Sequence, residues 1–223
     1  MGRTVLISDA ETPLGRELVS AYLQAGDTVV AAVSPQASPK PEWAGSLLAV
    51  DWNRRSSLST RNLLLTAVNR FEAVDEAVIL DCRTMSEKLA QELSSAEIES
   101  EVDAYVKGTV FLVREVMIHF TDRGRGVLCL AAFSPQAADS PVPPLDGAIR
   151  EFFHGFTRSL LATCASGPIT ANAFQSYSST PVEFTRFIAK TLEEKARKIS
   201  GRSFTLEPRQ GFLQGLVPAG RKP

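Results

Sequence analysis

The sequence predicts an α/β protein: a single doubly wound domain with a mainly parallel sheet of seven strands and helices on both faces. Runs rich in Val, Ile and Leu alternate with longer amphipathic segments, which is typical of βα units around a sheet buried on both sides. The 223 residues, 44% of them hydrophobic, suffice for one core. Because no linker long enough to separate two domains is visible, residues 1–223 are expected to form one domain.

Each predicted element follows from local patterning. The first helix is expected to begin after Thr12 and Pro13, a good N-cap and first-turn pair, and to end at Gly26. One long helix is expected over residues 95–122, and residues 134–144 are expected to be a loop. The strands are expected at 4–8, 28–33, 47–51, 76–80, 127–132, 169–174 and 203–206.

Charge and cysteine usage exclude several classes of function. The net charge is −1 and the Lys and Arg residues are scattered, so neither a nucleic acid nor a membrane is expected as a partner. A carboxylate follows only four strand-like positions at the N-terminus, which is too short an apolar run for a signal peptide or a membrane span. The cysteines are odd in number and far apart. A cytoplasmic protein without a metal site is therefore expected.

Three segments resemble the short-chain dehydrogenase/reductase family. Residues 4–19 are similar to its opening strand, glycine-rich turn and first helix, and residues 71–82 lie on its F-G-x-x-D-x-L-V-N-N-A-G stretch. The strand 127–132, followed by a Pro-rich loop and a helix, resembles the stretch in which a strand ends at the catalytic Ser and a helix carries Tyr-x-x-x-Lys. The resemblance implies a Rossmann-type domain that binds NAD or NADP.

The resemblance places unsuitable residues at the cofactor positions. Asp9 and Pro13 fall on two glycines of the turn and only Gly15 is kept, while Asp51 matches the family's adenine-contacting Asp and Asp81 lies in the N-N-A-G stretch. Asp9 and Glu11 would set negative charge against a diphosphate, and Pro13 lacks an N–H donor. Residues 31–35 offer neither an acid for a ribose hydroxyl nor an Arg for a 2′-phosphate. We therefore predict that this chain binds no cofactor.

The catalytic positions are also replaced. Ala132 falls on the Ser, Asp146 on the Tyr and Arg150 on the Lys, and Tyr105 lies near the family's proton-relaying Asn. Ala132 cannot donate a hydrogen bond, and an ionised Asp146 is only an acceptor. Asp146 and Arg150 stand at i and i+4, a spacing that favours a helical ion pair over chemistry. No catalytic residue is therefore predicted.

The substrate lid of the family is missing as well. After residue 174 the family has short helices that close over substrate, whereas here only five residues precede the point where the resemblance resumes at Thr180. A lid excludes water and positions substrate, so its loss predicts an inactive chain.

These features favour a non-catalytic subunit, a pseudoenzyme, that assembles with and stabilises an active NAD(P)-dependent alcohol or hydroxyacyl-CoA dehydrogenase of the same family. The chain resembles the inactive subunit of two-subunit hydroxyacyl-CoA dehydrogenases, which implies a two-plus-two heterotetramer with NAD or NADP bound by the active partner. Two of the predicted helices carry more apolar residues than one sheet-facing side can hold, and the surplus predicts the interface with the partner subunit. They are Phe111, Val116, Phe120, Phe152, Phe153, Phe156 and Leu160.

Two alternatives remain at the level of sequence. A homo-oligomeric sensor that binds a nucleotide or small ligand is supported by Gly15 and Asp51, and a ligand titration separates it from the first hypothesis. A divergent oxidoreductase would use Asp146 or Asp81 as a base, and turnover by the purified chain would establish it.

Overall fold

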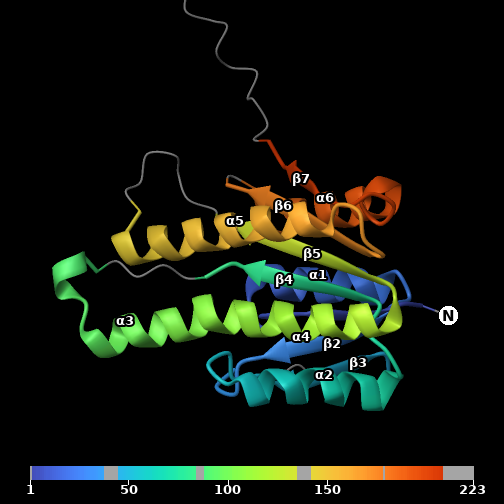
Figure 1. Ribbon diagram of the computed structural model, residues 1–223, viewed down its shortest axis with the longest axis horizontal. Coiled ribbons are helices and arrows are strands. Elements are labelled where there is room, and N and C mark those ends of the chain that lie inside the picture. Colours follow the sequence, from blue (N-terminus) through green and yellow to red (C-terminus); the bar gives the residue numbers. More distant parts are fainter. Residues whose placement is uncertain (1, 38–44, 84–87, 135–141, 178, 208–223) are drawn as a thin grey trace, which may run out of the picture.

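Seven parallel strands form one sheet in the computed structural model, which describes residues 2–37, 45–83, 88–134, 142–177 and 179–207 (Figure 1). The strand order is β3-β2-β1-β4-β5-β6-β7, and every neighbouring pair is parallel. The predicted fold class is confirmed. The strands are β1 (Thr4–Ile7), β2 (Thr28–Val33), β3 (Leu47–Asp51), β4 (Glu76–Asp81), β5 (Gly126–Phe133), β6 (Ile169–Ser176) and β7 (Arg202–Thr205).

Helices cover both faces of the sheet and divide the core in two. On one face α2 (Ser57–Phe71), α4 (Gly108–Arg123) and α5 (Pro144–Cys164) bury apolar side chains of the strands; on the other, α1 (Pro13–Gln24) and α6 (Pro181–Thr191) do so (Figure 1). The helix α6 runs on into the π-helical segment η3 (Leu192–Ala196), and the single turn η1 (Ala90–Glu92) precedes α3 (Ser95–Glu101). The alternation of buried strands and one-sided helices is what the apolar periodicity predicts.

The order of the strands reverses between β1 and β4. From β1 the chain builds outward through β2 to β3, and then returns to β4 and continues outward through β5, β6 and β7 on the other side. In open parallel sheets of this kind the loops at the carboxyl ends diverge at the reversal and leave a crevice for ligands. The carboxyl edge beside β1 and β4 is therefore the place where a site is expected.

The first helix is set against this edge by its cap and by a glycine. Thr12 is the N-cap, and its Oγ1 accepts a hydrogen bond of 3.1 Å from the Gly15 amide. A Cβ on Gly15 would lie 2.3 Å from the carbonyl oxygen of Asp9, so only glycine permits this close packing of helix on turn. The predicted start at Thr12 and Pro13 is confirmed, and the helix ends just before Gly26, which has a φ of 81°.

The predicted long helix is confirmed in extent, but its middle is not α-helical. The helical path runs through α3, the π-helical segment η2 (Val102–Lys107) and α4 without leaving helical backbone angles. Sequence periodicity gave no sign of the π segment. Such segments occur often at functional sites, and this one contains Tyr105.

Three residues predicted to form an interface lie inside the subunit instead. Val116 and Phe120 are fully buried and Phe153 is 3% exposed, all three in the core beneath α4 and α5. The prediction was wrong for them because these helices pack against both the sheet and neighbouring helices, so their apolar stripe is wider than one face. The other four residues of the set are half-buried, so part of each side chain is exposed, and their place in an interface stays a prediction. They are Phe111, Phe152, Phe156 and Leu160.

The connection from β6 to α6 is short. The strand ends at Ser176 and the helix begins at Pro181, with Thr180 as its N-cap. Within the described ranges, the structure contains no helix with the length and apolarity that a membrane crossing needs. The predicted loop over residues 134–144 lies mostly outside the described residues.

Candidate functional site

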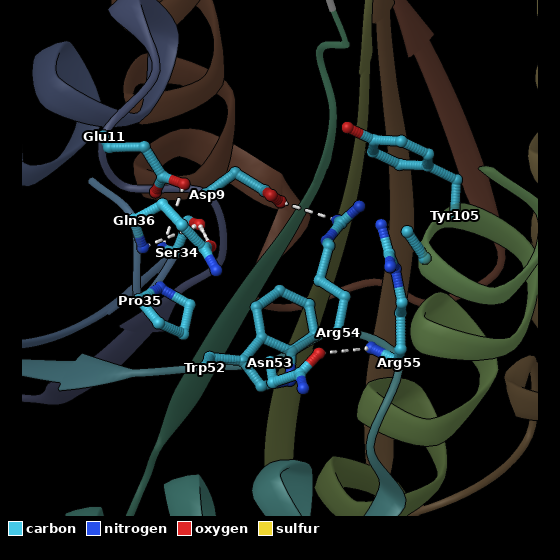
Figure 2. A pocket seen from close by; sticks show the side chains of 11 residues that line it. Asp9, Glu11, Ser34, Pro35, Gln36, Trp52, Asn53, Arg54, Arg55 and Tyr105 are labelled. Carbon is cyan, nitrogen blue, oxygen red and sulfur yellow. Dashed lines mark hydrogen bonds and ion pairs between the residues drawn. The ribbon is translucent and has the colours of Figure 1, made fainter. Parts of the chain in front are cut away.

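A cavity of about 380 Å³, named here the nucleotide pocket, opens at the carboxyl ends of β1, β2 and β3 (Figure 2). The segment after each strand contributes part of its wall, and the helical segment η2 closes the far side. The volume falls in the usual range of small-molecule sites, about 300–1,000 Å³. Its lining consists of Asp9, Glu11, Ser34, Pro35, Gln36, Trp52, Asn53, Arg54, Arg55, Ala104 and Tyr105.

The side chain of Arg54 extends from the loop after β3 toward Asp9 in the turn after β1, as Figure 2 shows. Its Nη2 donates to the Asp9 carboxylate at 2.8 Å, and both side chains are largely buried, with 13% and 14% exposed. The guanidinium lies 4.9 Å from the ring centroid of Trp52 and 4.7 Å from that of Tyr105. Such cation–π contacts hold an arginine in place at little entropic cost.

A glycine makes this placement of the loop possible. A Cβ on Gly108, at the junction of η2 and α4, would lie 2.6 Å from the carbonyl oxygen of Arg54. The loop after β3 therefore rests directly on helix backbone, and the position of Arg54 is fixed by packing as well as by charge.

The charge of Asp9 is compensated in the fold, contrary to the sequence argument. Burial raises the pKa of Asp9, while the guanidinium of Arg54 and the hydroxyl of Ser8 lower it. Asp9 has a φ of 51°, the left-handed conformation that a glycine normally occupies in such a turn. Its side chain is held by Ser8 Oγ at 2.7 Å, and Ser8 in turn accepts from the Leu80 amide of β4. Asp9 is thus a structural member of the site, and its negative charge does not face the pocket unpaired.

A second acid reaches the end of β2 from the turn after β1. Oε1 of Glu11 accepts a hydrogen bond of 3.0 Å from the Ser34 amide, directly after β2. Burial raises the pKa of Glu11, and the nearby charge of Asp9 raises it further. Residues 31–35 contain no acid, so the acid at this strand end comes from the turn after β1.

Arg83 links the replaced residues on the other side of the reversal. Its Nε donates to Asp81 at 3.1 Å, its Nη1 lies 3.4 Å from Asp146 Oδ1, and its Nη2 donates to the Asp146 carbonyl oxygen at 3.2 Å. The guanidinium is 6% exposed and lies 5.1 Å from the centroid of Tyr105, the ring that also contacts Arg54. Asp81 and Asp146 therefore act as acceptors within one ion network.

A second cavity, named here the inner pocket, measures only about 20 Å³ and lies beside the predicted catalytic positions. Tyr177, directly after β6, has its hydroxyl 3.4 Å from His154 Nε2 and donates to Gln175 Oε1 at 3.2 Å. Burial raises the pKa of Tyr177, and Arg150 lowers it. The lining consists of Asp81, Arg83, Ala132, Phe133, Ser134, Arg150, His154 and Tyr177.

The structure does not bring the residues predicted from sequence together in one place. Asp9 and Tyr105 line the nucleotide pocket, whereas Ala132, Arg150 and Asp81 line the inner pocket. Asp146 is buried next to Arg83. Two others stand apart: Asp51 is exposed outside both linings, and Pro13 is the exposed first residue of α1. Gly15 serves helix packing.

Sequence reasoning missed the residues that complete the site. Trp52, Arg54 and Tyr177 do not lie at positions that the family motifs mark, and Glu11 was expected only to repel a diphosphate. The only available signal was the Asn53-Arg54-Arg55 run directly after a strand, which places two cations at the carboxyl edge. Charge runs after strands are common, so this signal was weak.

Comparison with known proteins supports the fold and leaves the sequence family open. No family model and no curated protein sequence matches the chain. A 3-ketoacyl-(acyl-carrier-protein) reductase from Brucella melitensis complexed with NADH superposes with a TM-score of 0.81 at 18% identity, over 92% of this chain and 96% of that chain. A short-chain dehydrogenase from Leptospira borgpetersenii with bound NAD⁺ gives 0.79 at 14% identity, over 93% and 92%. One from Bacillus anthracis gives 0.78 at 15%, over 92% and 95%.

The chain therefore has the fold of the short-chain dehydrogenase/reductases. The prediction that it is not an enzyme is wrong: the solved structures that share its fold are dehydrogenases and reductases. The predicted lack of a cofactor likewise has no support from these structures, two of which contain NADH or NAD⁺. Asp9 and Asp81, two carboxylates at the family's cofactor positions, are each paired with an arginine in the fold.

Proposed function

We propose that the chain is a divergent oxidoreductase that binds a nicotinamide dinucleotide with its adenosine half in the nucleotide pocket. The observation that carries this proposal is the cavity of about 380 Å³ at the carboxyl edge where the strand order reverses. Ligands of open parallel sheets bind at such a reversal. The solved structures of the same fold that hold NADH or NAD⁺ support the same class of ligand.

The residues present fit the adenosine half of that cofactor. Pro35 offers an exposed apolar surface, and Arg54 and Arg55 supply positive charge. The N-terminus of α1 is capped by Thr12, so the phosphates would be held by arginine and not by that helix end. When bound, the nicotinamide would supply or accept the hydride.

The inner pocket supplies a proton donor in place of the missing Tyr and Ser. The hydroxyl of Tyr177 is protonated at neutral pH, because burial raises its pKa, and it lies beside His154 and Arg150. Asp81 and Asp146 already accept hydrogen bonds from Arg83, so the alternative in which either acts as the base is not favoured. We therefore assign to Tyr177 the role of holding the proton that a carbonyl oxygen receives on reduction.

The proposal is tested by titrating the purified chain with NADH and NADPH in a calorimeter, and by following their oxidation with a panel of ketones. We expect binding and slow turnover, and a drop of roughly 100-fold in kcat for Tyr177→Phe. Nucleotide affinity should be unchanged in that variant, because Tyr177 does not line the nucleotide pocket. Binding without turnover of any substrate would contradict the oxidoreductase, and equal turnover in Tyr177→Phe would contradict the assigned donor.

We also propose that the chain assembles with a dehydrogenase subunit of the same fold through the outer sides of α4 and α5, in a two-plus-two complex. Phe152 and Phe156 support this: their rings stack with centroids 5.6 Å apart, and both are only half-buried. Native mass spectrometry of the complex purified from its source tests the assembly. We expect a mixed oligomer that Phe156→Ser weakens and that Val182→Ser, an exposed position on α6, leaves intact. A monomer would contradict the proposal.

A further inference from the structure

Two buried polar atoms without a partner lie in the same cavity. Among the described residues, four buried side-chain atoms make no hydrogen bond: Glu11 Oε2, Arg54 Nε, Thr157 Oγ1 and Thr185 Oγ1. The first two belong to residues that line the nucleotide pocket, and one is an acceptor while the other is a donor. A buried polar group without a partner is costly and rare in proteins, so a pair of them in one cavity indicates a bound molecule that satisfies both.

Glu11 defines what one part of that molecule must offer. Its Oε1 is engaged by the Ser34 amide at the end of β2, which fixes the carboxylate and leaves Oε2 as a free acceptor. Figure 2 shows Glu11, Ser34 and Gln36 gathered on one side of the pocket, across from Arg54. A carboxylate in this place suits hydroxyl donors, and two adjacent hydroxyls suit it best, since its two oxygens are held at a fixed spacing.

Arg54 defines what the other part must offer. Its Nη2 is occupied by Asp9, and its planar group is held against Trp52 and Tyr105, while Nε has no acceptor. An arginine edge held in this way suits an anionic oxygen such as that of a phosphate. The charged residues of the lining are two acids, Asp9 and Glu11, and two cations, Arg54 and Arg55. The lining is therefore near neutral overall.

We infer that the nucleotide pocket takes a nucleoside 5′-phosphate whose ribose keeps a free 2′,3′-diol, with the hydroxyls donating to Glu11 and the phosphate accepting from Arg54. This rests on the proposed function and deepens it, because it selects the unphosphorylated ribose of NAD over the 2′-phosphate of NADP. A phosphate on the 2′ oxygen would remove a donor and bring like charge toward Glu11.

Ligand entry requires a small rearrangement. Both unpartnered atoms are buried, so a neighbouring side chain must shift before a ligand can contact them. Gln36 is suited to this, because it is exposed and its Oε1 accepts a hydrogen bond of 2.8 Å from the hydroxyl of Ser34 on the surface.

The experiment is calorimetric titration of the whole chain with three probes: AMP, adenosine and adenosine 2′-phosphate. For the wild type, we expect AMP to bind roughly tenfold more tightly than either other probe. Glu11→Gln keeps an acceptor for Ser34 but loses the carboxylate, so it should weaken AMP roughly tenfold and reduce, by the same factor, its preference over adenosine 2′-phosphate. Arg54→Lys keeps the charge opposite Asp9 but lacks Nε, so it should weaken AMP and leave adenosine unchanged.

Matched controls are Glu193→Gln and Arg186→Lys, both exposed and outside the pocket lining, which should leave all three affinities unchanged. Equal binding of AMP and adenosine 2′-phosphate by the wild type, or an unchanged preference in Glu11→Gln, overturns the inference while leaving the proposed function intact. If no nucleotide binds the wild type, both fail. AMP binding with the expected preference but without dehydrogenase turnover supports the inference and contradicts the proposed function.

Discussion

The two pockets at the carboxyl edge are built from similar charge pairs but differ greatly in volume. On each side of the strand reversal a carboxylate, Asp9 or Asp81, is matched by an arginine, Arg54 or Arg83, and both guanidinium groups lie about 5 Å from the ring of Tyr105. Yet the nucleotide pocket keeps about 380 Å³ and the inner pocket about 20 Å³.

The two arginines differ in the hydrogen-bond acceptors that they contact. Arg54 has one carboxylate partner and otherwise rests on aromatic surfaces along the wall of its pocket. Arg83 reaches Asp81 and both the side chain and the carbonyl oxygen of Asp146, so it spans the space between β4 and α5. Arg83 thus ties two elements together beside the smaller pocket, whereas Arg54 lies along the wall of the larger one.

The largest expected effect comes from removing that bridge. Arg83→Met leaves Asp81 and the nearly buried Asp146 without their shared cation, and we expect the free energy of unfolding at neutral pH to fall by about 3 kcal/mol. Urea denaturation measures it, with the exposed Arg186→Met as the control. Nucleotide affinity should change little. A variant as stable as the wild type would contradict the comparison, because it would show that the ion network around Arg83 does not stabilise the fold.

An intermediate effect is expected from the glycine that supports Arg54. Gly108→Ala places a Cβ 2.6 Å from the Arg54 carbonyl oxygen, so the loop must move away from the helix. We expect a loss of about 1–3 kcal/mol in unfolding free energy together with weaker nucleotide binding. The control is Gly155→Ala on α5, where an added Cβ meets nothing within 4 Å and should stabilise the helix slightly. Unchanged affinity in Gly108→Ala would show that Arg54 is placed by charge alone.

The smallest effect concerns a residue remote from both pockets. His119 Nε2 accepts from the Val74 amide at 3.1 Å, and burial lowers the pKa of this imidazole below its ordinary value of 6.5. A lowered pKa means that the folded state favours the neutral ring. Its contribution to stability is then complete above pH 6.5 and is lost as pH falls through the folded-state pKa.

Thermal unfolding between about pH 7.5 and pH 5 should therefore show the wild type losing stability relative to His119→Gln as the pH falls. Nucleotide affinity should be the same in both proteins at every pH. If the stability of the two proteins changes with pH in the same way, the pKa of His119 is the same in the folded and unfolded states. If nucleotide affinity differs between them, His119 influences the pockets at the opposite edge of the sheet.

The fold could be predicted from the sequence because its signals are local and repeated. Each strand is an apolar run flanked by amphipathic helices, and Thr12, Pro13 and Gly26 set the ends of the first helix within a few residues. The strand positions expected from the pattern agree with the structure to within two residues. The π segment around Tyr105 escaped prediction, because one changed turn barely alters helical periodicity.

The sequence by itself thus determined the sheet, the helices on its two faces and which charged residues follow the strands. Only the tertiary structure decided what those residues do. Arg54 meets Asp9 across 45 positions of sequence, and Glu11 meets Ser34 across 23. Such contacts depend on which loops the strand order brings together at one edge, and no local pattern encodes them. The apolar periodicity of a segment shows which of its faces is buried. The partner of a charged side chain depends instead on which other segments lie near it, and only the folded chain determines that.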